Sequence, residues 1–346
     1  MPTISESEFR KVLSGRDFGT LYYICGTEKM LVTHNTKKLI DKVAGKDPSD
    51  FNFHTFSNDF DVDEFAVALQ VVPFVSEYNV VVVKDLDFAD FSSADGDRII
   101  DLISAVSGDT IVILTFPTKL DEKASAKDKK LKTLSNKKGT VVELNKLTGQ
   151  ALQKKLVSWA SKRNVVLSPR VAAVIVEYCG TDLNSLRYVL EKLCAYVGEG
   201  GEITKEHVDT LVTKNLESSI FDISKAVINH DSTTAFKVLD RLIYQREEPI
   251  AILGVLATSY VDMYRARIAI KCGSRSTDLA KWFTYKSEFR LKQAENNSKR
   301  TSTAVLRKSI DAITETDILL KSTRTDDRVQ LELLIVKLLM IANEDR

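Results

Sequence analysis

The sequence predicts an α/β domain with a parallel sheet, followed by a three-helix domain and a further all-helical domain. Strand-like and helix-like segments alternate up to Leu147, and no strand signal follows. This alternation is typical of parallel strands joined by right-handed helical crossovers. Only 14 Gly and 6 Pro occur in 346 residues, which favours long helices. We therefore expect domains over residues 1–146, 147–215 and 216–346, within the two or three domains that this length suggests.

The first domain is expected to alternate strands and helices along the chain. Asn79–Val83 is entirely apolar after its first residue, as in a strand buried on both faces of a parallel sheet. Asp61–Val71 has an acidic first turn, which favours a helix because of the helix dipole. The predicted strands are Thr20–Cys25, Phe51–Phe56, Asn79–Val83, Thr110–Phe116 and Thr140–Leu144, and the predicted helices are Glu28–Val43, Asp61–Val71 and Asp97–Val106.

The remaining residues are expected to be helical throughout. Ser168 followed by Pro169 is a favourable helix start, because proline suits the first helical position. The smaller domain is predicted to contain helical segments over 149–163, 171–178, 182–197 and 203–214, the last of which completes a three-helix group. The last domain is predicted to contain helices over 219–229, 231–245, 249–272, 276–295 and 303–343, with a break near residues 323–327.

Composition excludes several classes of protein. The chain is 44% hydrophobic and 28% charged, as in ordinary globular proteins. No uncharged apolar run approaches the ~18 residues of a membrane span, and the amino terminus does not resemble a secretory signal. The four cysteines are scattered and the four histidines isolated, so we expect reduced thiols, a cytoplasmic location, and neither a metal nor another cofactor.

The net charge of +1 conceals three charged segments. Residues 47–83 contain seven acids and no Lys or Arg. Residues 119–138 contain eight lysines and three acids, and residues 261–308 contain twelve basic residues and four acids. Such runs are usually solvated helix faces, and we interpret 119–138 in that way. Two basic segments also raise the expectation of an anionic polymer partner.

No active site is predicted. A phosphate loop would follow the first strand, but Gly26 is followed by Thr27 and Glu28 and by no GK[ST] sequence. Glu28 would place negative charge where phosphates bind. Asp85 and Asp87 follow a buried strand, yet they lack the adjacent acid pair of a magnesium site, and we interpret them as turn residues.

Short motifs follow one another along nearly the whole chain. Those in the first domain are LYYICGTE at 21–28, VPFVSE at 72–77 and NVVVVK at 79–84. Those in the helical domains are DLN at 182–184, FDISKA at 221–226, LI at 242–243, EPI at 248–250, TDI at 316–318 and Lys321. Each motif is weak alone, but the ordered set resembles the delta subunit family of the bacterial DNA polymerase III clamp loader.

The resemblance implies a non-catalytic AAA+-like protein with a degenerate phosphate loop, a lid domain and a helical collar. It implies assembly with the loader's ATPase subunits (gamma/tau) and delta-prime, opening of the sliding clamp (beta), and placement of that clamp on primer-template DNA. It also implies membership of a DNA polymerase holoenzyme without polymerase chemistry in this chain. Two alternatives are an active ATPase of the same fold, and a DNA-binding scaffold that does not contact the clamp.

The resemblance assigns clamp binding to Val71, Val72, Pro73 and Phe74. Pro73 must end the preceding helix, because it has no amide hydrogen and clashes with a continuing helix. The resulting turn carries apolar side chains, which mark partner sites when they are exposed. In the alternative interpretation, Val72 and Phe74 fold back onto the protein's own core.

The collar offers two further candidate surfaces. A leucine-rich stripe at 331, 333, 334, 336, 339 and 340 is a candidate for assembly, although a core of the collar alone would also need such residues. The DNA-binding candidates are basic or aromatic residues that could contact phosphates or stack on bases, or else form a solvated face with its aromatics in the core. They are Trp282, Tyr285, Lys286, Phe289, Arg290 and Lys292, with Lys299 and Arg300.

Overall fold

The computed structural model describes residues 3–57, 59–74, 76–117, 125–283, 288–322 and 325–344. The chain divides into two compact units, Met1–Leu147 and Thr148–Arg346. The further division of the second unit near residue 215 stays a prediction. None of the described helices is long and apolar enough to cross a membrane.

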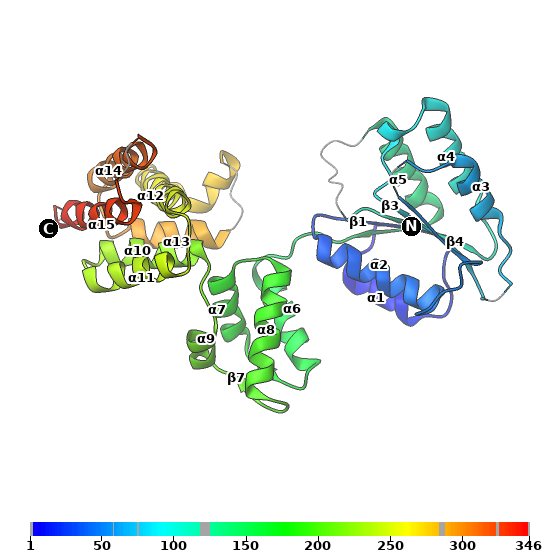
Figure 1. The fold of residues 1–346 in the computed structure, drawn as a ribbon, viewed down its shortest axis with the longest axis horizontal. Coiled ribbons are helices and arrows are strands. Elements are labelled where there is room, and N and C mark those ends of the chain that lie inside the picture. Colours follow the sequence, from blue (N-terminus) through cyan, green and yellow to red (C-terminus); the bar gives the residue numbers. More distant parts are fainter. Residues whose placement is uncertain are drawn as a thin grey trace. The chain divides into compact units, whose positions relative to one another are not determined.

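The first unit is built on a five-stranded parallel sheet with the strand order β2-β3-β4-β1-β5. Helices cover both faces, with α1 and α2 on one side and α3, α4 and α5 on the other (Figure 1). The strands are β1 Leu21–Cys25, β2 Phe53–Ser57, β3 Asn79–Lys84, β4 Thr110–Thr115 and β5 Thr140–Glu143. The helices are α1 Glu6–Ser14, α2 Lys29–Val43, α3 Val62–Gln70, η1 Phe88–Asp90, α4 Ser93–Ala105 and α5 Ala126–Lys138.

Strand alternation divides the core of this unit between the two faces of the sheet. Val81, Val83, Val112 and Leu114 face α3, α4 and α5 and belong to one apolar cluster. The intervening residues of β3 and β4 are buried toward the opposite face. All five expected strands are present within a few residues of their predicted ends. Helix α1 was not predicted; it begins with a capping box of Ser5 and Glu8.

The second unit begins with α6 Gly149–Ser161, α7 Pro169–Cys179, α8 Leu183–Val197 and the short α9 Lys205–Leu211. All four predicted helical segments are present, and α9 with its seven residues is shorter than the predicted 203–214. The expectation that no strand follows Leu147 is wrong, because β6 Val166–Leu167 and β7 Glu202–Ile203 form a two-stranded parallel sheet. Strands of two residues are too short to show a periodicity.

The rest of this unit consists of helices around one apolar core. They are α10 Leu216–Ile228, α11 Ser232–Tyr244, α12 Pro249–Lys271, η3 Ser276–Lys281, α13 Glu288–Ser298, α14 Thr303–Ser322 and α15 Asp327–Asn343. Side chains from α10, α11, α12, α14 and α15 share this core. The predicted helix over 276–295 is wrong, since a short 3₁₀ helix and the separate α13 occupy that region.

Candidate functional site

Helix α3 holds the segment predicted to bind the clamp. Its start is capped by Asp61, whose carboxylate accepts from the amide of Asp63 at 2.7 Å. Its end is held by Asn79, whose side-chain Nδ2 donates to the carbonyl of Ala68 at 2.8 Å. Phe65 lies fully buried between helix and sheet, with its ring 5.3 Å from that of Phe56. The helix is therefore fixed at both ends, and the chain leaves it at a defined point.

The residues that follow α3 form an exposed apolar tip, which we define as Val71, Val72, Pro73 and Phe74. Phe74 is 94% exposed and Val72 is 80% exposed, while Val71 and Pro73 are partly buried. The alternative in which Phe74 and Val72 plug the protein's own core therefore does not hold in this structure. Val67 on α3 is also exposed, at 67%, and was not predicted.

The vestigial phosphate loop is occupied by the chain itself. The Thr27 amide donates to Asn145 Oδ1 at 3.1 Å, and the Glu28 amide donates to the Leu144 carbonyl at 3.0 Å. Gly26 has φ +145°, and a Cβ there would lie 2.2 Å from the Leu144 oxygen. Two backbone donors of this loop, which could otherwise bind phosphate, are thus already used within the chain. The sequence did not indicate this role of Asn145.

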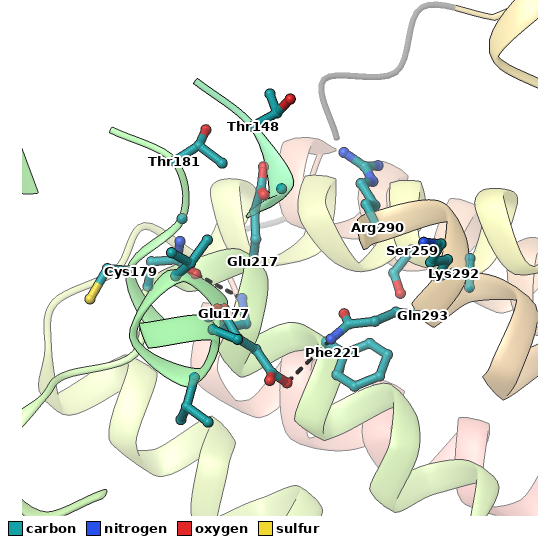
Figure 2. Close-up of a pocket in the computed structure, with 18 of the residues that line it drawn as sticks. Thr148, Glu177, Cys179, Thr181, Glu217, Phe221, Ser259, Arg290, Lys292 and Gln293 are labelled. Atoms are coloured by element: carbon teal, nitrogen blue, oxygen red, sulfur yellow. Dashed lines mark hydrogen bonds between the residues drawn. The ribbon is translucent and has the colours of Figure 1, made fainter. Parts of the chain in front are cut away.

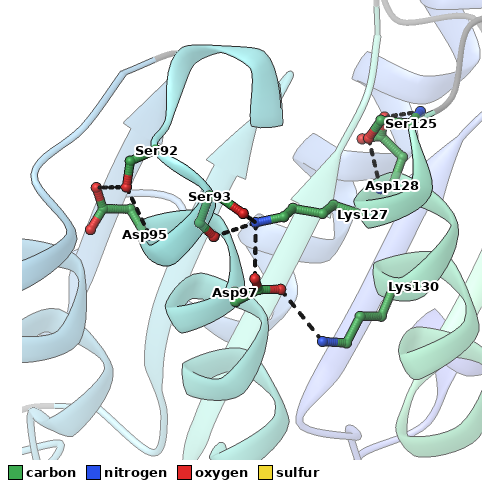
Figure 3. A network of polar contacts seen from close by, with 8 residues as sticks. All are labelled: Ser92, Ser93, Asp95, Asp97, Ser125, Lys127, Asp128 and Lys130. Atoms are coloured by element: carbon green, nitrogen blue, oxygen red, sulfur yellow. Dashed lines mark hydrogen bonds and ion pairs between the residues drawn. The ribbon is translucent and has the colours of Figure 1, made fainter.

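The lysine-rich helix α5 is not only a solvated face, because several of its lysines contact neighbouring elements. Lys127 Nζ lies 3.2 Å from Asp97 Oδ2 on α4, and Lys130 Nζ lies 3.6 Å from the other carboxylate oxygen (Figure 3). The hydrogen bond from Lys127 lowers the pKa of Asp97, with a further contribution from Lys130. Lys138 donates to the Ser104 carbonyl at 2.8 Å. Several lysines of α5 therefore fix it to its neighbours.

The DNA-binding candidates of the collar have different environments. Trp282 is 80% exposed and Lys292 is exposed, as a nucleic-acid contact requires. Arg290 instead donates from Nε to Asp262 Oδ2 at 2.7 Å, and Asp262 is buried. Tyr285, Lys286 and the side chain of Phe289 lie outside the described residues.

Two other candidates have partners within the collar. Lys299 pairs with Glu295 at 2.9 Å, and Arg300 donates to Asn229 at 3.0 Å. Both side chains remain exposed, so these contacts leave them open to solvent. Arg290 is thus the candidate with a structural role, because its guanidinium neutralises a buried carboxylate.

A large pocket lies within the second unit, between α7 and helices α10, α12 and α13. Its volume is about 1120 Å³, and acidic, basic and apolar side chains line it together. Figure 2 shows Gln293 and Glu177 joined across it, with Gln293 Nε2 3.3 Å from Glu177 Oε1. The described part of the chain contains no group of three or more potential metal ligands. Among the residues that the structure describes, the lining of this pocket therefore contains no metal-binding set.

Comparison with known proteins gives matches in both units. The family model described as "DNA polymerase III, delta subunit" matches residues 22–145, and a second model, for the carboxyl-terminal domain of the same family, matches residues 217–338. The DNA polymerase III subunit delta of Bacillus subtilis (strain 168) is 25% identical over 338 residues, 95% of each chain. A probable DNA polymerase III subunit delta of Aquifex aeolicus (strain VF5) is 21% identical over 252 residues, 70% of this chain and 69% of the relative.

A solved structure agrees with these matches. The Bacillus subtilis DNA clamp loader delta protein superposes with a TM-score of 0.66 at 24% identity, over 96% of this chain and 99% of that protein. This likeness confirms the predicted fold, a parallel-sheet domain followed by helical regions. With two family models that match the sheet domain and the carboxyl-terminal helices, and a relative aligned along almost the full length, the chain belongs to the family of DNA polymerase III delta subunits.

Proposed function

We propose that this chain, as the delta subunit of a DNA polymerase III clamp loader, binds the sliding clamp through its apolar tip and opens it for loading onto primed DNA. It acts without an active site of its own, in the cytoplasm, where the chromosome is replicated. The observation that carries the proposal is the 94% exposure of Phe74 at the end of a helix anchored at both ends. A large aromatic side chain in that position is suited to enter a pocket on a partner.

The proposal that the chain does not hydrolyse ATP is supported by the occupied phosphate loop. Asn145 and Leu144 accept hydrogen bonds from the amides of Thr27 and Glu28, so a nucleotide would have to displace residues 144 and 145 to reach these donors. No GK[ST] lysine is present to contact the phosphates. These features disfavour the alternative of an active ATPase of the same fold.

We assign assembly with the gamma/tau ATPase subunits and delta-prime to the collar, and in particular to the outer face of α15. Of the predicted leucine-rich stripe, Leu331 and Leu334 are buried in the collar core. The other face carries Val329, Leu333, Val336 and Met340, each between 42% and 65% exposed. These four recur at helical spacing and form an apolar face that a neighbouring helix could cover. Leu333→Glu should therefore prevent assembly while the isolated chain keeps its helix content, and normal assembly would exclude this face.

Primer-template DNA is proposed to contact the exposed collar candidates Trp282 and Lys292. Lys292→Glu should weaken DNA binding of the assembled loader and lower its salt dependence, because one phosphate contact is lost. Arg290 is unsuitable for this test, since its loss would leave Asp262 buried without its closest cation. A loader that binds DNA normally with Lys292→Glu would remove Lys292 from the interface.

The test of the central proposal is direct binding of the full chain to purified sliding clamp, with Phe74→Ala as the variant. An anchoring aromatic typically contributes ~2 kcal/mol or more, so we expect a loss of about thirtyfold or more in affinity. Because Phe74 is exposed, the variant should unfold at the same temperature as the parent. Tyr188→Ala, a change of another exposed aromatic in the second unit, is the matched control and should bind normally. Unchanged affinity in Phe74→Ala would contradict the assignment.

A further inference from the structure

The apolar tip lies at the edge of the sheet where the strands begin, which we call the amino edge. Phe51, 77% exposed, lies at the same edge just before β2. Its neighbour Asn52 accepts from the amide of Val80 at 2.8 Å, so the approach to β2 is hydrogen-bonded to the start of β3. Phe74 lies five residues before β3 begins at Asn79. Two exposed phenylalanines therefore precede the amino ends of two adjacent strands.

Carboxylates also gather at the amino edge. Asp50 precedes β2, Glu77 precedes β3, Asp109 precedes β4 and Asp17 precedes β1, and these four strands are consecutive in the sheet. All four side chains are exposed, and among the described residues none of them forms a salt bridge. The fifth strand, β5, instead follows Lys137 and Lys138, so the acidic character ends at that border of the sheet.

Tyr78 connects the approach to β3 with the approach to β1. Its hydroxyl donates to Glu77 Oε1 at 3.0 Å, and this bond is the main cause of a raised Tyr78 pKa. The charges of Glu77, Asp17 and Asp109 contribute in the same direction. The Tyr78 ring also packs edge-on against Phe18, with centroids 6.3 Å apart, so the segments that carry Glu77 and Asp17 lie side by side.

We propose that the amino edge is a composite docking surface for the sliding clamp, in which Phe51 is a second apolar contact beside the tip and the four carboxylates select a clamp pocket rimmed by Lys and Arg. This inference rests on the proposed function, since it specifies the chemistry of the partner at the same site. Charge complementarity favours this occupant, because a basic rim is attracted by the exposed carboxylates. The same carboxylates repel phosphates, so the amino edge is unsuited to nucleic acid.

The two parts of the surface are expected to affect different rate constants. Exposed rim charges mainly accelerate association, and their effect falls with ionic strength. Apolar contacts that form on docking mainly slow dissociation. Phe51 and the carboxylates can therefore be tested separately by kinetics on the full chain and the purified clamp.

The charge test compares two variants that each remove two carboxylates. Asp50→Asn/Glu77→Gln removes two of the four carboxylates of the amino edge and keeps an oxygen that can accept from Tyr78. Asp90→Asn/Asp101→Asn is the control, because both residues are exposed, precede none of the strands and form no salt bridge among the described residues. At low salt the first variant should associate about three- to tenfold more slowly, and the control should match the parent. The difference should vanish at roughly 0.3 M salt, and dissociation should not change.

The apolar test is Phe51→Ala, with Tyr188→Ala again as the control. Phe51→Ala should dissociate about fivefold faster or more, with little change in association and no change in thermal stability. Association that is unchanged or faster in Asp50→Asn/Glu77→Gln, or unchanged dissociation in Phe51→Ala, would overturn the composite surface. The proposed function would survive that result if Phe74→Ala still loses clamp binding. A parent chain that does not bind the clamp at all would instead contradict the proposed function itself.

Discussion

The two edges of the same parallel sheet have opposite properties. At the amino edge, Phe74 and Phe51 are exposed and no described ion pair holds the carboxylates beside them. At the carboxyl edge, where proteins of this architecture usually bind ligands, Asn145 and Leu144 accept hydrogen bonds from the amides of Thr27 and Glu28. We call this edge closed, because its own chain takes up these donors. The comparison teaches that one sheet can have one edge where its own chain takes up backbone amides and another where apolar and acidic side chains stay exposed. The sheet core between the two edges is continuous and apolar.

The largest expected effect contrasts two phenylalanines of the same segment. Phe65→Ala should lower the free energy of unfolding by about 3–5 kcal/mol, because it leaves a cavity beneath α3. Phe74→Ala should change it by no more than about 0.5 kcal/mol, since the side chain contacts mainly water. Urea denaturation of both variants measures the difference. Comparable losses would mean that the apolar tip packs on the protein in solution.

The second prediction concerns the closed carboxyl edge. Gly26→Ala should destabilise the first unit by about 2–4 kcal/mol, because the new Cβ combines a positive φ with a backbone clash against Leu144. Gly45→Ala is the matched control, since Gly45 also has a positive φ but open space around it. The control should lower the free energy of unfolding by about 1 kcal/mol, which is the strain of the left-handed conformation alone. Equal costs in thermal denaturation would show that residues 144–146 move away easily.

A smaller effect is expected at Asn145. Asn145→Ala removes the acceptor for the Thr27 amide and should lower the free energy of unfolding by about 1 kcal/mol. Asn145→Asp places a carboxylate oxygen where the amide oxygen was, so this variant should retain most of that stability. Hydrogen exchange at the Thr27 amide reports the bond directly, with faster exchange expected in Asn145→Ala. Protection that is equal in all three chains would mean that another group holds this amide.

The smallest expected effect is that of ATP, which should be close to none. A ligand present at 100 times its dissociation constant stabilises a protein by about 2.7 kcal/mol, enough to raise the melting temperature by several degrees. We expect millimolar Mg-ATP to leave the melting temperature of the parent unchanged. Saturable binding at micromolar ATP would contradict the closed edge. Binding that appears only in Asn145→Ala would show that this one side chain keeps the edge closed.

Much of the fold could be predicted because its signals are local. The apolar runs of β3 and β4, the acidic start of α3 and the turn at Pro73 depend on neighbouring residues alone. The predicted helix over 276–295 was wrong because the 3₁₀ helix Ser276–Lys281 ends before α13 begins at Glu288. The strands β6 and β7 were missed because each has two residues. Local patterns therefore identified all five strands of the large sheet and missed the two strands of two residues.

By itself the sequence determined that the phosphate loop lacks its lysine, that the chain must turn at Pro73, and that apolar residues follow that turn. Only the tertiary structure decided that Phe74 remains exposed, that Arg290 neutralises Asp262, and that Asn145 reaches Thr27 across 118 positions. It also brought four separate carboxylates to one edge of the sheet. The physical reason is that exposure and pairing depend on which distant residues the strand order makes neighbours, and a pattern of adjacent residues carries no information about that order.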